Sequence, residues 1–415
     1  MSNQHIKLRQ VFLNGNFFSL WLGQIISQFG ERLTQMALIG LIYEMSLVST
    51  KEMSKLLFFM ILPVFIFSPI AGVYVDRWDR KKTLIISDII RAVLVLFIPI
   101  TYKIILANNS TNLYPIYFIV FLVFSGSRFF IPAKSAIVPE IMDQKDLRAA
   151  NSIASTTKMI ATVLGVLLGG YIVTLFGAMV CFYIDSITFI ISAISIAFLK
   201  RKHIAQPKSE ENISNKIILI KNQFLEGIKE IKNNNNLRFL VKMLSFLMAA
   251  AGAIFVIFPV FANQQFHTHT NGLGTLISML GAGLLTGAIL LGKLFHNSTN
   301  KKMISISIIS IALLFILLAN VHNMIIACVI MFFIGVIGIP IIVCAETLIH
   351  EMVADKMIGR VYSAVEIIIH AVFLIAMFLM GLLGDIASPG FVFSIIGSVF
   401  AFIMFVFIAK ELANG

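Results

Sequence analysis

The feature that most constrains this chain is a series of long apolar segments that recur along almost its whole length. Each is close to the roughly 20 residues that an α-helix needs to cross the apolar core of a bilayer. The segments are continuous and do not alternate in polarity, which favours helices over the strands of a β-barrel. The sequence therefore predicts an all-α membrane protein with twelve transmembrane helices, at residues 16–45, 54–75, 83–106, 113–131, 151–174, 179–199, 239–262, 273–294, 303–320, 323–346, 359–383 and 389–409.

Composition supports a membrane protein, because 59% of the 415 residues are hydrophobic and 13% are charged, whereas soluble domains carry about 25% charged residues. The net charge of +12 does not indicate a nucleic-acid partner. With a cytoplasmic N-terminus and twelve spans, most Lys and Arg residues fall in cytoplasmic segments, as the positive-inside rule expects. This asymmetry predicts a multi-pass membrane protein with both termini in the cytoplasm.

The segment 200–238 is polar and rich in Lys and Asn, and it divides the chain into two halves of six predicted spans. We therefore expect an N-terminal six-helix bundle at 1–199, a cytoplasmic central loop at 200–238 and a C-terminal six-helix bundle at 239–415. Within the loop, apolar residues recur at steps of three and four, which predicts an amphipathic helix on the inner membrane surface. These residues are Ile217, Ile220, Phe224, Ile228 and Ile231.

Ionisable residues inside predicted spans are costly, and by default they mark functional sites. Glu31 and Arg32 lie deep in the first span. Because burial disfavours the charged form of a carboxyl group, Glu31 facing a water-filled cavity is a candidate to bind and release a proton during transport. An ion pair within the bundle is the alternative. Adjacent residues on a helix do not face each other, so we expect Glu31 and Arg32 to have separate partners.

Glu366 and His370 are four residues apart in the eleventh span, so they share one face of a helix. Histidine titrates near neutral pH, which makes the pair a candidate proton relay. The alternative is that His370 only satisfies Glu366 through a hydrogen bond. Together with Glu31 and Arg32, these two residues are our candidates for proton coupling and for the substrate cavity.

A dense cluster of charges stands at residues 72–82, between the second and third predicted spans. Charges packed so tightly predict a short loop at a membrane surface. With charged residues of the third and fourth spans they form a candidate cytoplasmic network that stabilises one of two bundle arrangements and so acts as a gate. A purely topological role for the basic residues is the alternative. The residues of this gate motif are Gly72, Asp76, Arg77, Arg80, Lys81, Asp88, Arg91 and Arg128.

Gly165, Gly169 and Gly170 give the fifth predicted span a face of small residues. Such a face lets a helix approach its neighbour closely, and ordinary helix packing is the plain alternative. The three cysteines lie in apolar segments and have no spacing typical of a disulfide framework or a metal site. No catalytic motif and no phosphate-binding Walker loop occur. We therefore expect no enzyme, no metal and no cofactor, and an ion gradient rather than ATP as the energy source.

Several stretches resemble the major facilitator superfamily, and within it the branch of the bacterial macrolide-efflux proteins and of siderophore exporters such as the enterobactin exporter. The loop at 72–82 has the spacing of the superfamily's signature between transmembrane helices 2 and 3. One difference is Val166, which stands where antiporters of the superfamily often have proline. The other matching stretches are 16–24, 30–34, 87–92, 132–140, 147–152 and 359–361.

This resemblance implies two six-helix bundles that alternate access to a central cavity, in a monomer of the bacterial cytoplasmic (inner) membrane. It also implies that Asp76 helps to hold the outward-open state and that Arg128 corresponds to an arginine linked to proton transfer. We expect a proton antiporter that exports small amphipathic organic molecules, either siderophores or drugs such as macrolides. An uptake transporter or a lysolipid flippase of the same fold is one alternative, and a non-transporting membrane receptor or scaffold is another.

Overall fold

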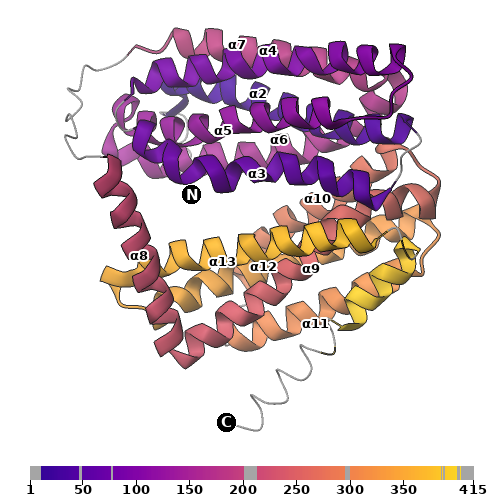
Figure 1. The fold of residues 1–415 in the computed structure, drawn as a ribbon. Helices are drawn as coiled ribbons and strands as arrows, with labels where there is room; N and C mark the ends of the chain where they lie inside the picture. The colour runs from indigo at the N-terminus through magenta and orange to yellow at the C-terminus, as the bar shows by residue number, and fades with distance from the viewer. Residues whose placement is uncertain are drawn as a thin grey trace. The chain divides into compact units, whose positions relative to one another are not determined.

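The computed structural model describes residues 11–45, 49–75, 78–200, 213–294, 300–384, 386, 388–399 and 402. Throughout these residues the regular secondary structure is helical, which confirms the all-α prediction (Figure 1). The helices are α2 (Gly15–Glu44), α3 (Thr50–Val75), α4 (Arg80–Ala107), α5 (Tyr114–Ile141), α6 (Leu147–Phe176), α7 (Ala178–Ala197), α8 (Ile213–Asn233), α9 (Asn235–Phe266), α10 (Thr270–Leu294), α11 (Asn300–Ala319), α12 (Met324–Met352), α13 (Asp355–Leu383), the short 3₁₀-helix η1 (Gln144–Asp146) and the apolar helix Pro389–Val399.

Among the described residues, eight helices are long and apolar enough to cross a membrane. They lie in α4, α5, α6, α7, α9, α10, α12 and α13. The other four predicted spans fall on α2, α3, α11 and the helix Pro389–Val399. Every predicted span thus overlaps a helix, while the total of twelve transmembrane helices stays a prediction.

The chain divides into two compact units. The first unit contains residues 1–46 and 56–212, and the second contains residues 47–55 and 213–415. In Figure 1 the helices α2 to α7 run from indigo to magenta, and the part of the second unit from α8 onwards runs from dark rose to yellow. The second unit begins within the predicted central loop, at the start of α8.

In the first unit, α2 packs against both α6 and α7. Glycines at the contacts make this close packing possible, because they have no side chain to hold the helices apart. A Cβ on Gly23 would lie 3.2 Å from the Ser192 Oγ of α7, and one on Gly169 of α6 would lie 3.3 Å from the Leu33 Cα of α2. A Cβ on Gly165 would lie 2.8 Å from the Arg32 Cβ. The other main contacts of this unit join α4 to α5 and to α7.

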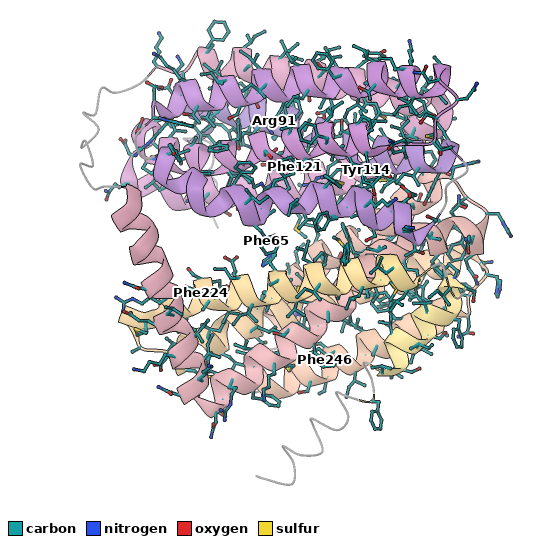
Figure 2. The ribbon with its side chains drawn as sticks, in the orientation of Figure 1. Phe65, Arg91, Tyr114, Phe121, Phe224 and Phe246 are labelled. Atoms are coloured by element: carbon teal, nitrogen blue, oxygen red, sulfur yellow. The ribbon has the colours of Figure 1, made fainter. Side chains whose placement is uncertain are left out.

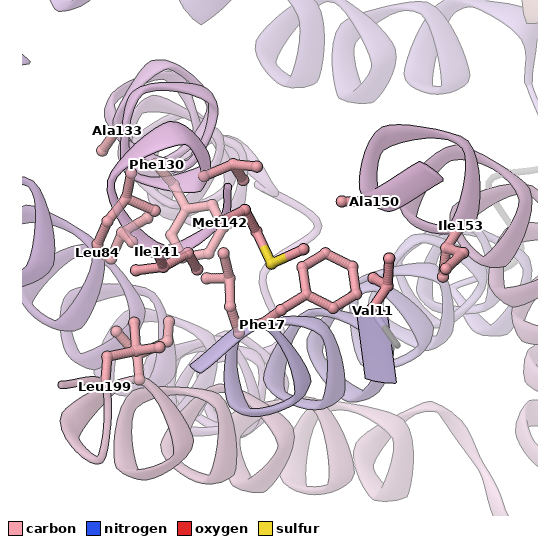
Figure 3. Close-up of a cluster of buried hydrophobic side chains, with 14 of the residues drawn as sticks. Val11, Phe17, Leu84, Phe130, Ala133, Ile141, Met142, Ala150, Ile153 and Leu199 are labelled. Carbon is pink, nitrogen blue, oxygen red and sulfur yellow. The ribbon is translucent and has the colours of Figure 1, made fainter. Parts of the chain in front are cut away.

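One end of the first unit is held by an apolar core and by basic residues, and we call it the basic end. Its core contains Phe17, Leu84, Ile137 and Ile196, all nearly inaccessible to solvent, and Figure 3 labels the first two. The start of α4 is fixed there by two side chains. Arg80 donates to the Ala136 carbonyl at 2.9 Å and pairs with Glu140 at 2.5 Å, and Lys81 Nζ donates to the Ala197 and Leu199 carbonyls.

In the second unit, α10 packs against α12 and α9 packs against α13. Glycines again mark the contacts: Gly283 and Gly335 meet between α10 and α12, and Gly252 of α9 lies on the backbone of Phe373 in α13. The amphipathic sequence of the central loop forms α8, and this helix packs on α13. Gly227 is buried there against the Arg360 backbone, and Glu226 forms an ion pair with the Arg360 side chain.

Candidate functional site

Arg91 of α4, labelled in Figure 2, forms a buried ion pair with Asp88 on the same helix, in the first unit. The three-residue spacing places both side chains on one face of the helix. Asp88 is 0% exposed and Arg91 is 3% exposed. The Arg91 guanidinium also donates to the Ser127 hydroxyl at 3.3 Å and to the Ser87 carbonyl at 3.4 Å. Two charges so fully removed from solvent are tolerated because they pair with each other.

Two aromatic rings from neighbouring helices also contact the Arg91 guanidinium. Its Cζ lies 4.6 Å from the ring centre of Phe130 on α5 and 4.3 Å from that of Phe189 on α7. A guanidinium within about 6 Å of a ring face is attracted by the ring's electrons. The two rings and the Asp88 carboxylate therefore hold the cation in place.

Glu31 on α2 approaches the same cation. Its Oε2 lies 4.0 Å from Arg91 Nη1, and the Glu31 side chain is 20% exposed. Arg128 on α5 also lies within electrostatic range of Glu31 and Arg91. Arg128 Nε is buried and makes no hydrogen bond within the described residues. Glu31 is thus the acid of this group that keeps contact with solvent.

A third acid, Asp185 on α7, completes the cluster. It is 0% exposed and accepts a hydrogen bond from the Thr188 hydroxyl at 3.1 Å. Its charge interacts with those of Glu31 and Arg91. The other oxygen of Asp185 and that of Asp88 are also buried, and the hydroxyls of Thr34 and Ser192 are their polar neighbours.

We call Glu31, Asp88, Arg91, Arg128 and Asp185 the ionic cluster. It has three carboxyl groups and two guanidinium groups, so its charges balance when one carboxyl group holds a proton. A buried group of charges favours the balanced state, because an uncompensated charge away from water is costly. The cluster is therefore a candidate to take up and release one proton.

Gly30 of α2 makes this arrangement possible, because it lies directly against Asp185 and Thr188. A Cβ on Gly30 would overlap the Thr188 hydroxyl and lie 2.5 Å from the Asp185 Oδ1. We expect Gly30→Ala to displace both side chains and to destabilise the protein by about 1–3 kcal/mol, the usual cost of overpacking. The measurement is the thermal unfolding midpoint of the purified protein.

Gly15→Ala, on the same helix, is the matched control, since no atom lies within 4 Å of its Cβ position. Unchanged unfolding of Gly30→Ala relative to this control would contradict the close packing of α2 on α7.

The other predicted site residues do not belong to the ionic cluster. Arg32 donates to Gln35 at 2.6 Å and lies against Gly165, so it has a different partner from Glu31. Arg80 and Lys81 fix the basic end. Gly72 belongs to α3 and Gly170 is buried in α6, whereas Asp76 and Arg77 lie outside the described residues.

Glu366 and His370 lie on α13 in the second unit, and both are exposed. The His370 ring is 2.8 Å from the backbone carbonyl of Glu366, and this is the hydrogen bond that the structure shows between the two residues. Their role as a proton relay stays a prediction. Within the described residues, no group of three or more His, Cys, Asp or Glu side chains could hold a metal ion.

Comparison with known families gives a match over nearly the whole chain. The sequence profile of the Major Facilitator Superfamily matches residues 20–342 and 247–413. Every residue of the ionic cluster falls within the first of these ranges.

Two bacterial proteins illustrate the similarity to curated sequences. The chain is 26% identical over 308 residues to the "Putative bacilysin exporter BacE" of Bacillus subtilis (strain 168), and the match covers 72% of each chain. It is 25% identical over 383 residues to "Macrolide efflux protein A" of Streptococcus pyogenes, and this match covers 89% of each chain.

Solved structures share the fold at lower sequence identity. A mutant of the nucleoside transporter NupG superposes with a TM-score of 0.71 and 13% identity, over 96% of this chain and 99% of the other. The POT family transporter PepTSo superposes with a TM-score of 0.67 and 10% identity, over 95% and 98%. At sequence identities this low, the superpositions show a shared fold and nothing more specific.

Proposed function

The chain belongs to the Major Facilitator Superfamily, and from this membership we propose that it exports small amphipathic organic molecules in exchange for protons. Its relatives are membrane transporters, so the protein is a transporter rather than an enzyme. Export, proton coupling and the kind of cargo are our proposal.

The ionic cluster is the observation that supports the proposal of proton exchange. Of its two most buried acids, Asp88 pairs with Arg91 and Asp185 lies within electrostatic range of it, while Glu31 is 20% exposed at 4.0 Å from the same arginine. Protonation of Glu31 from solvent would weaken its attraction to Arg91, and loss of that proton would restore it. A scaffold has little reason to keep such a costly arrangement inside its helices.

The relatives support a small organic cargo. One is named for the export of bacilysin and another for the efflux of macrolides. These names favour drug-like molecules as cargo, and siderophores stay the second candidate from the sequence. Uptake, lysolipid flipping and a non-transporting receptor stay as alternatives that the experiment below separates.

We place the protein in the bacterial cytoplasmic membrane, as a monomer with its basic end towards the cytoplasm. The positive-inside rule supports this direction, because Arg80, Lys81 and Lys82 gather at that end. Both termini would then lie in the cytoplasm.

Everted membrane vesicles test direction and coupling together. We expect vesicles with an acidic lumen to accumulate radiolabelled erythromycin, which is a macrolide, radiolabelled bacilysin or a radiolabelled siderophore. One pH unit supplies about 1.4 kcal/mol per proton, which allows about tenfold accumulation when one proton is exchanged. Nigericin, which collapses the pH difference, should release the accumulated cargo.

Vesicles without the protein are the control. Accumulation that ignores nigericin would contradict proton coupling. Loss of cargo from preloaded vesicles would indicate uptake into the cell instead. If none of the three cargo classes moved in either direction, the proposal of a small organic cargo would be wrong.

A further inference from the structure

A cavity of about 170 Å³ lies at the basic end of the first unit, between α2, α5 and α6. Phe17 and Ala150, both labelled in Figure 3, contribute to its wall and also belong to the apolar core of this end. Trp21 and Val138 extend the apolar side of the wall. The indole of Trp21 is held by a hydrogen bond of 3.2 Å to the Thr157 hydroxyl. The cavity therefore has a fixed apolar surface.

The polar side of the cavity presents hydrogen-bond donors. Lys134 of α5 and Gln24 of α2 both line it. Gln24 is 5% exposed, and its side-chain Nε2 has no hydrogen-bond partner within the described residues. A buried amide nitrogen without an acceptor is costly, so this group favours a ligand that brings an acceptor.

The charge in the cavity is positive and uncompensated. No acidic residue lines it, and Lys134 makes no ion pair or hydrogen bond with any residue that the structure describes. Another cation, Lys158 of α6, also acts electrostatically on Lys134. Lys158 lies one helical turn beyond Ala154 and two beyond Asn151, both of which line the cavity, so these residues share one face of α6. An ammonium group that lines a cavity without a carboxylate partner favours an anion in that cavity.

The size of the cavity limits what it can hold. Sites for whole drug-sized ligands measure about 300–1,000 Å³, so about 170 Å³ suits one end of a cargo molecule. Gln24, Gln28 and Glu31 follow each other at steps of four and three on one face of α2. Seven residues of helix rise about 10 Å, so the cavity is separate from the ionic cluster but in line with it.

We propose that this cavity is the subsite that binds the carboxylate of an amphipathic cargo, with Lys134 and Gln24 as donors and Phe17, Trp21 and Val138 against the adjoining apolar group. This inference rests on the proposed function and predicts that, among its candidate cargoes, those with a carboxylate bind at this subsite. The ammonium of Lys134 supplies the charge, and the amide of Gln24 supplies a second hydrogen bond.

Equilibrium binding to the purified full-length protein in lipid nanodiscs tests the subsite. The probes are N-dansyl-leucine and N-dansyl-leucinamide, which share their apolar groups and differ in a carboxylate against a neutral amide. We expect the carboxylate to bind about tenfold more tightly, since a charge-assisted hydrogen bond is about twice as strong as a neutral one. Lys134→Gln should remove this preference, and Lys134→Arg should keep it.

Lys103→Gln is the matched control, because it removes the same charge from an exposed position on α4. Three results would each overturn the subsite. They are equal affinity of the wild type for both probes, a preference for the carboxylate that survives in Lys134→Gln, and no binding of either probe. Binding at equilibrium needs no gradient, so its result is independent of the vesicle experiment. If the vesicles show export but the purified protein shows no preference for the carboxylate, the subsite alone is disproved. If the protein prefers the carboxylate but the vesicles show no export, export alone is disproved.

Discussion

Arg91→Met is expected to destabilise the protein by about 3–5 kcal/mol, the usual cost of removing one partner of a buried ion pair. The substitution leaves Asp88, which is 0% exposed, without the cation that it binds. It also removes the charge that Phe130 and Phe189 contact. The measurement is the thermal unfolding midpoint of the purified protein, compared with that of the wild type.

Two further variants test whether loss of the ion pair between Asp88 and Arg91 causes this destabilisation. Asp88→Asn combined with Arg91→Met removes both charges, so it should recover much of the lost stability and make the two substitutions strongly non-additive. Arg238→Met, at an exposed arginine of α9 that binds Asn235, should change stability by no more than about 0.5 kcal/mol. A double variant as unstable as Arg91→Met would show that packing around the arginine, and not its charge, matters.

The positions of the helices follow from the sequence because long apolar runs need no information about their neighbours. The largest difference concerns α5, which was predicted to end at residue 131 and ends at Ile141. Pro132 and Pro139 both lie inside this helix. A proline removes one backbone hydrogen bond, but the helix continues where other contacts hold it. Arg80 supplies such contacts through Ala136 and Glu140.

The ionic cluster was only partly predictable. Its acids and arginines on α2, α4 and α5 stand out as charges in apolar segments, but the sequence assigned Glu31 to proton coupling and Arg91 to a cytoplasmic gate. The structure places these two side chains 4.0 Å apart. Gly126 allows this, since a Cβ there would lie 3.1 Å from the Arg91 Cγ. Such contacts depend on helix packing, which periodicity within one segment does not reveal.

Asp185 is a charge in an apolar segment, but the sequence does not reveal its partners, for the same reason. Its neighbours Gly30 and Thr34 are about 150 positions away in the chain and meet it through the packing of α2 on α7. The one partner of Asp185 that is close in the sequence is Thr188, three residues later, whose hydroxyl donates a hydrogen bond to the Asp185 carboxylate. The spacing of Glu366 and His370 correctly indicates a shared face, but it does not distinguish a bond to the carboxylate from the observed bond to the backbone.

Glu31→Gln is expected to abolish proton-driven accumulation in everted vesicles while leaving cargo binding intact. Glutamine has the shape of a protonated glutamate but cannot exchange a proton. Glu31 is the cluster's solvent-accessible acid, since it is 20% exposed while Asp88 and Asp185 are 0% exposed. Accumulation of labelled cargo should therefore fall at least about tenfold, to the level that nigericin gives, because one pH unit is worth about 1.4 kcal/mol per proton.

The matched control for Glu31→Gln is Glu44→Gln, the same substitution at an exposed acid on the same helix, where the carboxylate accepts from the Tyr102 hydroxyl at 3.3 Å. This variant should accumulate cargo as the wild type does. Binding of N-dansyl-leucine measures whether Glu31→Gln still folds and holds a ligand, since the proposed carboxylate subsite lies two helical turns from Glu31. Retained binding with lost accumulation assigns the coupling proton to Glu31. Full pH-driven accumulation in Glu31→Gln would transfer that role to Asp88 or Asp185, and it would mean that a proton reaches a carboxyl group which solvent does not touch in this structure.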